Sequence, residues 1–362
     1  MEPDTTKPKF WVRLLAWVKR HKWPIIIIGG ALTLAIGTFA YLILSPAPAA
    51  APVVVKHTIE PPKPAVKYYS PLTGVEVASE AATKAPVTAI MIENSPDARP
   101  QSGLKNSGVV FEAIAEGGIT RFLVLYQQEK PKLIGPVRSV RMYYVDWLAA
   151  FNASVAHVGG SAAALVEVRN GKYRDIDQFF NSGSYWRATD RYAPHNVYTS
   201  FERLDALNAK KGYTESNFTG FTRIDGAPSK EPDATKINIT ISSFLYNSSY
   251  IYDAQTNTYA RSEGGAPHMD REDGQITPSV VIAMHVNETT VLEDGYRQQI
   301  NAIGSGDATI FQNGTATNVT WHKASRTDQI TFTDAVGKDV PLVRGQTWIA
   351  AVPNGSGAVS WQ

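Results

Sequence analysis

The segment from Pro24 to Leu44 carries no charged side chain and is almost entirely apolar. A helix of about 20 such residues is long enough to cross the hydrocarbon core of a bilayer. The run therefore predicts a single N-terminal transmembrane helix over 24–44. This anchor constrains everything else, because the remaining chain must fold on one side of a membrane or the other.

The residues before this run are basic, and they predict the orientation of the anchor. Positive charge next to a membrane span stays on the cytoplasmic side. We therefore expect 1–23 to be a cytoplasmic tail and the chain after 44 to be extracytoplasmic, at the cell membrane. The alternative is a cleaved signal peptide, since Ala-Pro-Ala-Ala follows at 47–50. The length of the apolar run favours an uncleaved anchor. The basic residues are Lys7, Lys9, Arg13, Lys19, Arg20 and Lys22.

Composition narrows the chemistry that the rest of the chain can perform. The chain has no cysteine, which excludes disulfides, thiol catalysis, thiolate metal sites and a lipid-modified N-terminal cysteine. The net charge is only +2, and no basic stripe with interleaved aromatic residues occurs, so nucleic acid is not an expected partner. Residues 45–67 are rich in proline and alanine and predict a semi-extended spacer.

Two patterns of secondary structure follow the spacer. Between 68 and 228, strand-like and helix-like segments alternate, which predicts a mixed α/β domain. Between 236 and 357 the apolar runs are short, β-branched and separated by turns, which predicts an all-β sandwich or barrel-like domain. The expected fold class is therefore α+β in two lobes, with a boundary between about Gly220 and Lys236.

The stretch from Glu93 to Tyr144 holds the densest polar motifs. Two β-rich runs, 108–114 and 120–126, flank Glu116-Gly-Gly-Ile and predict a hairpin. A helix is expected to begin near Ser139 as its N-cap. Its apolar stripe falls at helical spacing, namely Val140, Tyr144, Trp147, Leu148 and Phe151.

The arginines of the chain suggest a binding site. Arg138 and Arg141 fall where the expected helix begins, and free N–H groups at a helix start favour anions. A structural alternative is that they pair with Glu112, Glu116 or Asp146. We expect one polar cleft in the first domain, in which these two arginines lie with Arg99, Arg121, Arg187 and Arg191.

A second polar cluster includes Asp190 and His195. His195 is a candidate general base or hydrogen-bond donor, although a histidine after proline in a loop is often structural. Glu112 and Glu116 could form a glycosidase carboxylate pair, which needs a separation of about 5 Å or about 6.5–9.5 Å. Positions four apart in a strand lie about 13 Å apart, so salt bridges are the alternative that we favour.

Other reaction chemistries find no support in the sequence. The histidines do not show metal-ligand spacing, and no nucleophile-elbow motif occurs, so we expect no metal, no cofactor and no assigned catalytic residue. The histidines considered are His157, His195, His268, His285 and His322.

Several motifs resemble the family of the bacterial lipoprotein YerB, a domain of unknown function. They include Arg99-Pro-Gln-Ser-Gly-Leu, Ala115-Glu-Gly-Gly-Ile-Thr-Arg-Phe, Ile134-Gly-Pro-Val-Arg-Ser, Pro194-His-Asn and Gly345-Gln-Thr-Trp-Ile. The resemblance covers nearly all of 68–353. It implies a membrane-tethered extracytoplasmic bacterial protein and carries no agreed activity. Many relatives are lipid-anchored through cysteine, so here a transmembrane helix must replace the lipid.

These observations support two classes of function. The first is a binding or scaffold module of the cell envelope that recognises an anionic or glycan wall component, or an envelope partner. A regulator of another envelope enzyme cannot be separated from it by sequence. The alternative is a wall-glycan hydrolase or transferase that uses Glu112, Glu116 or His195.

Overall fold

The computed structural model describes residues 9–46, 49, 66–290 and 297–362. The chain divides into two units, 1–64 and 65–362, and each is described by itself. The start of the expected basic tail and most of the expected spacer, 47–48 and 50–65, lie outside the described residues.

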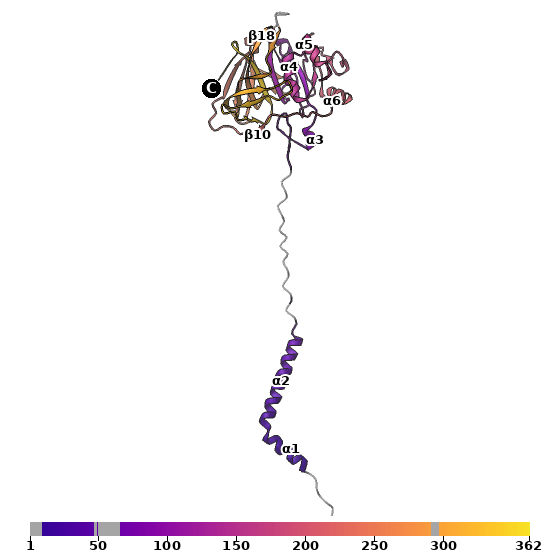
Figure 1. Cartoon of the computed structure of the whole chain (residues 1–362), viewed down its shortest axis with the longest axis vertical. Coiled ribbons are helices and arrows are strands. Elements are labelled where there is room, and N and C mark those ends of the chain that lie inside the picture. The colour runs from indigo at the N-terminus through magenta and orange to yellow at the C-terminus, as the bar shows by residue number, and fades with distance from the viewer. Residues whose placement is uncertain (1–8, 47–48, 50–65, 291–296) are drawn as a thin grey trace, which may run out of the picture. The chain divides into compact units, whose positions relative to one another are not determined.

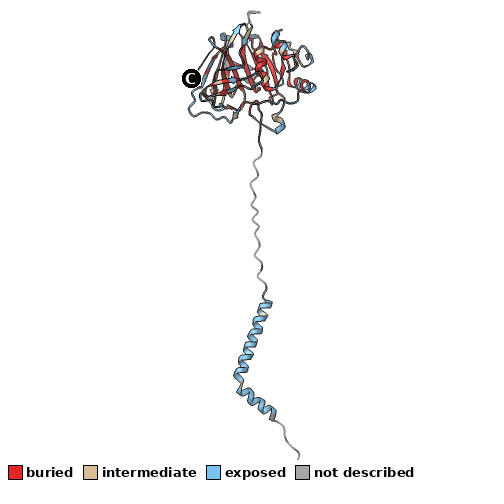
Figure 2. Cartoon of the chain, in the orientation of Figure 1, coloured by how far each residue is buried: buried red, intermediate tan, exposed pale blue. Residues whose placement is uncertain are grey.

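The N-terminal unit contains two helices, α1 (Lys9–Arg20) and α2 (Lys22–Leu44) (Figure 1). Helix α2 contains the predicted apolar run, and its mean hydropathy is 2.1. None of its residues is buried, as Figure 2 shows. It is long and apolar enough to cross a membrane. Helix α1 occupies most of the predicted basic tail.

The second unit is organised by a sheet of ten strands. Hydrogen-bond pairing is parallel for β17–β24, β24–β4, β3–β6 and β6–β7, and antiparallel for the other neighbours. In spatial order the strands are β22 (Thr331–Thr333), β21 (Thr315–Lys323), β20 (Gly304–Gln312), β17 (Val280–Val286), β24 (Thr347–Pro353), β4 (Val109–Glu116), β5 (Ile119–Tyr126), β3 (Thr88–Glu93), β6 (Ser154–Ala156) and β7 (Arg174–Asp175).

The expectation of two separate lobes is corrected by this sheet. Strand β24, from near the end of the chain, lies between β17 and β4 and pairs in parallel with both. All seven of its residues are buried. A central strand needs hydrogen-bonding neighbours at both of its edges, because its buried backbone N–H and C=O groups must be paired. Strand β24 finds one neighbour in each half of the chain. Residues 65–362 therefore form one compact unit.

Each face of the ten-stranded sheet is covered by a different layer. Helices α4 (Met142–Leu148) and α5 (Ala162–Val168) pack on one face, where Phe111 stacks on Trp147. The other face is covered by α6 (Phe201–Lys210) near β3 and β5, and by a five-stranded sheet near β17 and β24. That sheet has the order β14 (Ala266–Pro267), β13 (Thr258–Glu263), β12 (Ser248–Asp253), β11 (Lys236–Thr240) and β25 (Ala358–Trp361).

Short elements complete the described part of the unit. Single turns occur at α3 (Glu80–Thr83) and at the 3₁₀ helices η1 (Pro96–Ala98), η2 (Ala149–Phe151), η3 (Ser182–Ser184) and η4 (Phe244–Tyr246). The two-stranded sheets pair β1 (Tyr68–Tyr69) with β2 (Glu76–Val77), β8 (Trp186–Arg187) with β9 (Val197–Tyr198), β10 (Arg223–Ile224) with β23 (Leu342–Val343), β15 (Met269–Asp270) with β16 (Gly274–Gln275), and β18 (Glu288–Thr290) with β19 (Gln298–Ile300). The α+β class is confirmed.

The predicted hairpin is confirmed, whereas the predicted helix begins later in the chain than expected. Strands β4 and β5 pair around Gly117 and Gly118, whose φ angles of 56° and 75° suit glycine, so the hairpin is confirmed. The helix begins at Met142, with Arg141 at its N-cap. Ser139 is not the cap, because its hydroxyl donates to the carbonyl of Val158 instead.

Candidate functional site

Polar residues gather at one edge of the sheet, where three parallel strands end. Glu93 is the last residue of β3, His157 directly follows β6, and Asp175 is the last residue of β7. The strands β3, β6 and β7 run parallel, so their carboxyl ends meet at the same edge. In open sheets this edge is where ligands commonly bind. The polar side chains around it therefore form the candidate site.

Five residues form the group that we call the Glu93 cluster: Glu93, Ser95, Asp97, Arg138 and His195. The Glu93 Oε1 atom lies 3.3 Å from Arg138 Nε, and Oε2 lies 3.0 Å from His195 Nδ1. The Glu93 side chain is only 4% exposed, whereas those of Arg138 and His195 are 25% and 22% exposed. A buried carboxylate thus holds two side chains that remain open to solvent.

The backbone fixes Arg138 at this position, while its guanidinium remains largely unused. The Arg138 N–H donates to Met91 and its carbonyl accepts from Val158, so the residue is held between β3 and the chain after β6. Within the described residues, the guanidinium contacts Glu93 and donates no geometrically good hydrogen bond. Its remaining N–H groups are available to an external acceptor.

The geometry around His195 does not match a serine nucleophile. Ser95 Oγ lies 3.2 Å from His195 Nδ1, the same nitrogen that faces Glu93. A serine–histidine–acid triad needs the serine and the acid on opposite ring nitrogens. The other nitrogen, Nε2, lies 3.9 Å from the exposed carboxylate of Asp97. Glu93 can therefore orient the imidazole, with Nε2 directed toward the surface.

The structure does not bring the six predicted arginines into one cleft, which corrects that expectation. Arg121 and Arg141 bind Glu116. Arg99 donates to Asn94 and to the carbonyl of Leu245, and Arg191 donates to backbone carbonyls of 97 and 100. Arg187 donates to Asn196 and lies at a separate cavity with Asp190. Only Arg138 and His195, of the predicted site residues, belong to the Glu93 cluster.

Glu116 is the centre of a structural ion-pair group. Its carboxylate lies 2.8 Å from Arg121 and 2.5 Å from Arg141, whose side chains are 2% and 6% exposed. Burial of Glu116 opposes its ionisation, but the two guanidiniums outweigh burial and lower the pKa of Glu116. The alternative that these arginines are structural is therefore the one that the geometry supports for Arg121 and Arg141.

Glu112 and Glu116 do not form a carboxylate pair. The register of β4 on β5 shifts between Ile114 and Glu116, which marks a β-bulge. Because an extra residue reverses the alternation of side chains, Glu116 reaches Arg141 beside α4, whereas Glu112 reaches Trp348 on the other face of the sheet. Glu112 is also fully buried. The proposed glycosidase role of this pair is corrected.

Glu112 belongs to a buried polar network that the sequence reasoning missed. Arg261 from β13 lies 3.0 Å from Glu112 and 3.1 Å from Glu263, and its guanidinium stands over the Trp348 ring. His268 receives a hydrogen bond from Arg261. The network ties the five-stranded sheet to β4 and β24. Every second residue of β13 is buried, which places Arg261 and Glu263 on one inward face. This alternation of side chains is the feature from which the network could have been predicted.

Titration of Glu263 should make stability depend on pH. Burial raises the pKa of Glu263 to about 7, against the attraction of Arg261. A carboxyl with a raised folded-state pKa adds stability below its unfolded pKa, near 4.5, and this contribution is lost as the pH rises through about 7. We expect Glu263→Gln to flatten the decline in urea-unfolding free energy over that range. The exposed variant Glu231→Gln should keep the wild-type profile, and an unchanged profile in Glu263→Gln would contradict this assignment.

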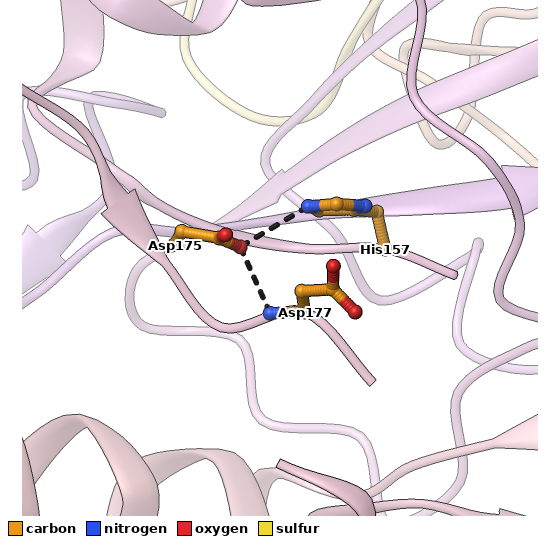
Figure 3. Close-up of side chains that lie close together, drawn as sticks. All are labelled: His157, Asp175 and Asp177. Atoms are coloured by element: carbon orange, nitrogen blue, oxygen red, sulfur yellow. Dashed lines mark hydrogen bonds and ion pairs between the residues drawn. The ribbon is translucent and has the colours of Figure 1, made fainter. Parts of the chain in front are cut away.

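One group in the described residues has donor atoms close enough to hold a metal ion: His157, Asp175 and Asp177, whose ligand atoms lie within 4.8 Å of one another (Figure 3). His157 Nδ1 lies 2.8 Å from the Gly159 carbonyl, and Nε2 lies 3.1 Å from Asp175. Arg169, however, pairs with Asp177 and lies 3.9 Å from Asp175. The protein thus places its own cation beside both carboxylates, and we interpret the group as an ion-pair network between β6 and β7.

Comparison with known proteins defines the class of this chain. The family described as "Protein of unknown function (DUF3048)" matches twice, with its N-terminal domain over residues 72–214 and its C-terminal domain over 237–349. The chain belongs to this family.

Its relatives include YerB of Bacillus subtilis (strain 168), which is described as a lipoprotein. It is 32% identical over 298 residues, which cover 81% of this chain and 88% of YerB. The crystal structure of YerB superposes with a TM-score of 0.72 at 30% identity, and the match covers 81% of this chain and 100% of that structure. The resemblance stated from the motifs is confirmed.

Proposed function

We propose that this chain is a membrane-anchored protein of the bacterial cell envelope that binds an anionic group of a wall polymer or envelope partner at the Glu93 cluster. The observation that carries the proposal is the guanidinium of Arg138. It is held in place by a buried acid, is 25% exposed, and keeps N–H groups without an acceptor in the described structure. Arginine suits such a role because its planar fork binds carboxylate or phosphate with two hydrogen bonds.

The surrounding residues support the same reading. Glu93 contacts Arg138 through Oε1 and His195 through Oε2. One acid therefore positions two potential hydrogen-bond donors. The guanidiniums of Arg99, Arg121, Arg141 and Arg191 already donate to protein acceptors. The Arg138 guanidinium makes no such bond in the described structure, so it is free to donate to an arriving anion.

Binding to purified cell-wall fractions tests the proposal. We expect the Arg138→Gln variant of the full chain in detergent micelles to be retained about tenfold less, since a charge-assisted hydrogen bond contributes about 1.5–3 kcal/mol. Its free energy of unfolding should change by no more than about 1 kcal/mol, because the pair with Glu93 is partly exposed. Retention should also weaken at high salt.

The control is Lys338→Gln, which removes one positive charge from an exposed turn away from the cluster. It should be retained like the wild type. Equal losses in the two variants would mean that net charge, and not the site, governs retention. A drop of 3–5 kcal/mol in stability for Arg138→Gln would instead identify Arg138 as a structural ion-pair partner.

A second candidate function rests on the orientation of His195. Glu93 contacts Nδ1 and leaves Nε2 directed toward the surface, an arrangement in which imidazole can serve as a general base. A hydrolase or transferase of this kind would use His195 with Glu93, and not Glu112 or Glu116. Release of soluble fragments from the wall fractions, abolished in His195→Gln, would favour this function over binding alone.

The proposed location gives a separate prediction. Helix α2 is long and apolar enough to cross a bilayer, and basic residues precede it, so we place 65–362 outside the cytoplasmic membrane. Trp11, Trp17 and Trp23 precede the span on its N-terminal side, and aromatic side chains prefer the membrane interface. Protease added to cells stripped of their wall should digest 65–362. Digestion only after lysis would reverse the topology.

A further inference from the structure

A cavity of about 410 Å³ lies apart from the Glu93 cluster, beside the short sheet of β8 and β9. Trp186 and Arg187 of β8, Asp190 of the following loop and Tyr198 of β9 line it, together with Leu133 and Arg271. This volume falls within the range of small-molecule sites, about 300–1,000 Å³. The site combines an aromatic ring with converging polar groups.

Tyr198 presents a buried hydroxyl at the wall of this cavity. Tyr198 is 1% exposed, and its hydroxyl lies beside the guanidinium of Arg271, another lining residue, without a well-directed hydrogen bond to any described residue. Gly135 packs closely against the ring, since a Cβ at that position would lie 2.8 Å from Tyr198 Cδ1. A guanidinium can only donate, so the O–H of Tyr198 has no acceptor among the described residues. A buried donor without an acceptor is costly, and a ligand that supplies an acceptor would remove this cost.

The charges around the cavity leave one cation uncompensated. Asp190 and Arg271 pair with each other at 2.6 Å, so their charges offset one another. Arg187 donates to the neutral side chain of Asn196 at 2.7 Å and has no acidic partner in the described structure. Its guanidinium is exposed, and it can therefore pair with a negative group on the ligand.

Trp186 supplies a flat apolar surface. The guanidinium of Arg203 lies over its ring, 4.7 Å from the centroid, and holds the ring in place. A fixed indole beside hydroxyl and charged groups suits a ring that is apolar on one face and carries polar groups around its edge. Saccharides have this character, whereas an unmodified aliphatic ligand would offer no acceptor to the Tyr198 hydroxyl and no negative group to Arg187.

We propose that this cavity binds a saccharide unit that carries an anionic substituent, with the sugar ring against Trp186, a sugar hydroxyl bonded to Tyr198 and the anion paired with Arg187. The inference rests on the proposed function, since it names the chemical class of ligand for a second subsite of the same envelope protein. The two subsites share one segment of chain. His195 belongs to the Glu93 cluster, whereas Asn196 and Tyr198 of the same segment shape the cavity.

Titration of the full chain in detergent micelles with three related sugars tests the inference. The probes are glucuronic acid, glucose 6-phosphate and glucose, followed by saturation-transfer NMR of the sugar protons. We expect both acidic sugars to bind about tenfold or more tightly than glucose, because only they can pair with Arg187. A preference for one acid over the other would identify the substituent as carboxylate or phosphate.

Two conservative variants locate the binding. Tyr198→Phe removes only the hydroxyl, so the fold should be retained while affinity for the acidic sugars falls about threefold to tenfold. Arg187→Gln should remove the preference for acidic sugars over glucose. Lys338→Gln, which also removes one charge, should bind like the wild type.

The inference is overturned if neither acidic sugar shows saturation transfer, if glucose binds as well as they do, or if both variants bind like the wild type. Arg138→Gln separates this inference from the proposed function. If wall retention depends on Arg138 but no sugar binds, the cavity assignment alone fails. If the sugars bind as described and retention is unchanged in Arg138→Gln, the assignment of the Glu93 cluster alone fails.

Discussion

Replacing Arg261 by Met will lower the free energy of unfolding by about 3–5 kcal/mol, the usual cost of removing one partner from a buried ion pair. Arg261 is fully buried and contacts both Glu112 and Glu263 at about 3 Å. Methionine fills similar space but leaves Glu112 without its cation and Glu263 with only Arg99, 3.4 Å away. Chemical unfolding of 65–362 in the full chain, followed by tryptophan fluorescence, measures the loss.

A combined variant provides the control for this prediction. Adding Glu112→Gln and Glu263→Gln to Arg261→Met removes the stranded charges, and buried ion networks replaced as a whole often cost little. The triple variant should regain most of the lost stability. If the single variant unfolds like the wild type, the network does not hold the two sheets together.

Replacing Glu116 by Ala should also cost about 3–5 kcal/mol, because Arg121 and Arg141 would remain buried without a counter-charge. The exposed variant Glu231→Ala should change stability by less than about 0.5 kcal/mol. The lowered pKa of Glu116 sets the pH range over which its contribution to stability is lost. Its contribution is present above the unfolded pKa, near 4.5, and is lost as the pH falls through the lower folded pKa.

The same variant decides between a structural and a catalytic Glu116. A structural acid predicts a large loss of stability with no selective effect on wall binding at temperatures where the variant is folded. A Glu116→Ala variant that unfolds like the wild type but loses wall binding would show that Glu116 belongs to the functional site.

Local patterns predicted the local structure of this chain well. The Gly117-Gly118 pair and the β-rich runs around it specified the hairpin, and the uncharged run specified the helix over 24–44. The bulge between Ile114 and Glu116 could not be read in the same way, because alternation alone places Glu112 and Glu116 on one face. That single register shift separates two carboxylates that the sequence pattern groups together.

The site was harder to predict because its contacts are distant in the sequence. Arg138 and His195 were candidates, but their shared partner, Glu93, begins the same motif without an obvious role. The partners of the arginines are also far away in the sequence. Arg99, for example, donates to the carbonyl of Leu245, 146 positions away. The sequence motifs indicated that arginines gather in this part of the chain, and only the fold shows which of them already pair with an acid.

The position of β24 has a consequence for how the chain is made. Its pairing with β4 requires residues 347–350, which are synthesised long after β4 itself. Until then β4, buried on both faces in the finished protein, has β5 on one side and an open edge on the other. Open, apolar edges recruit foreign strands. Nascent chains should therefore need a holding chaperone until β24 has been synthesised, and a truncated product that ends near 228 should aggregate even though it contains the whole first family domain.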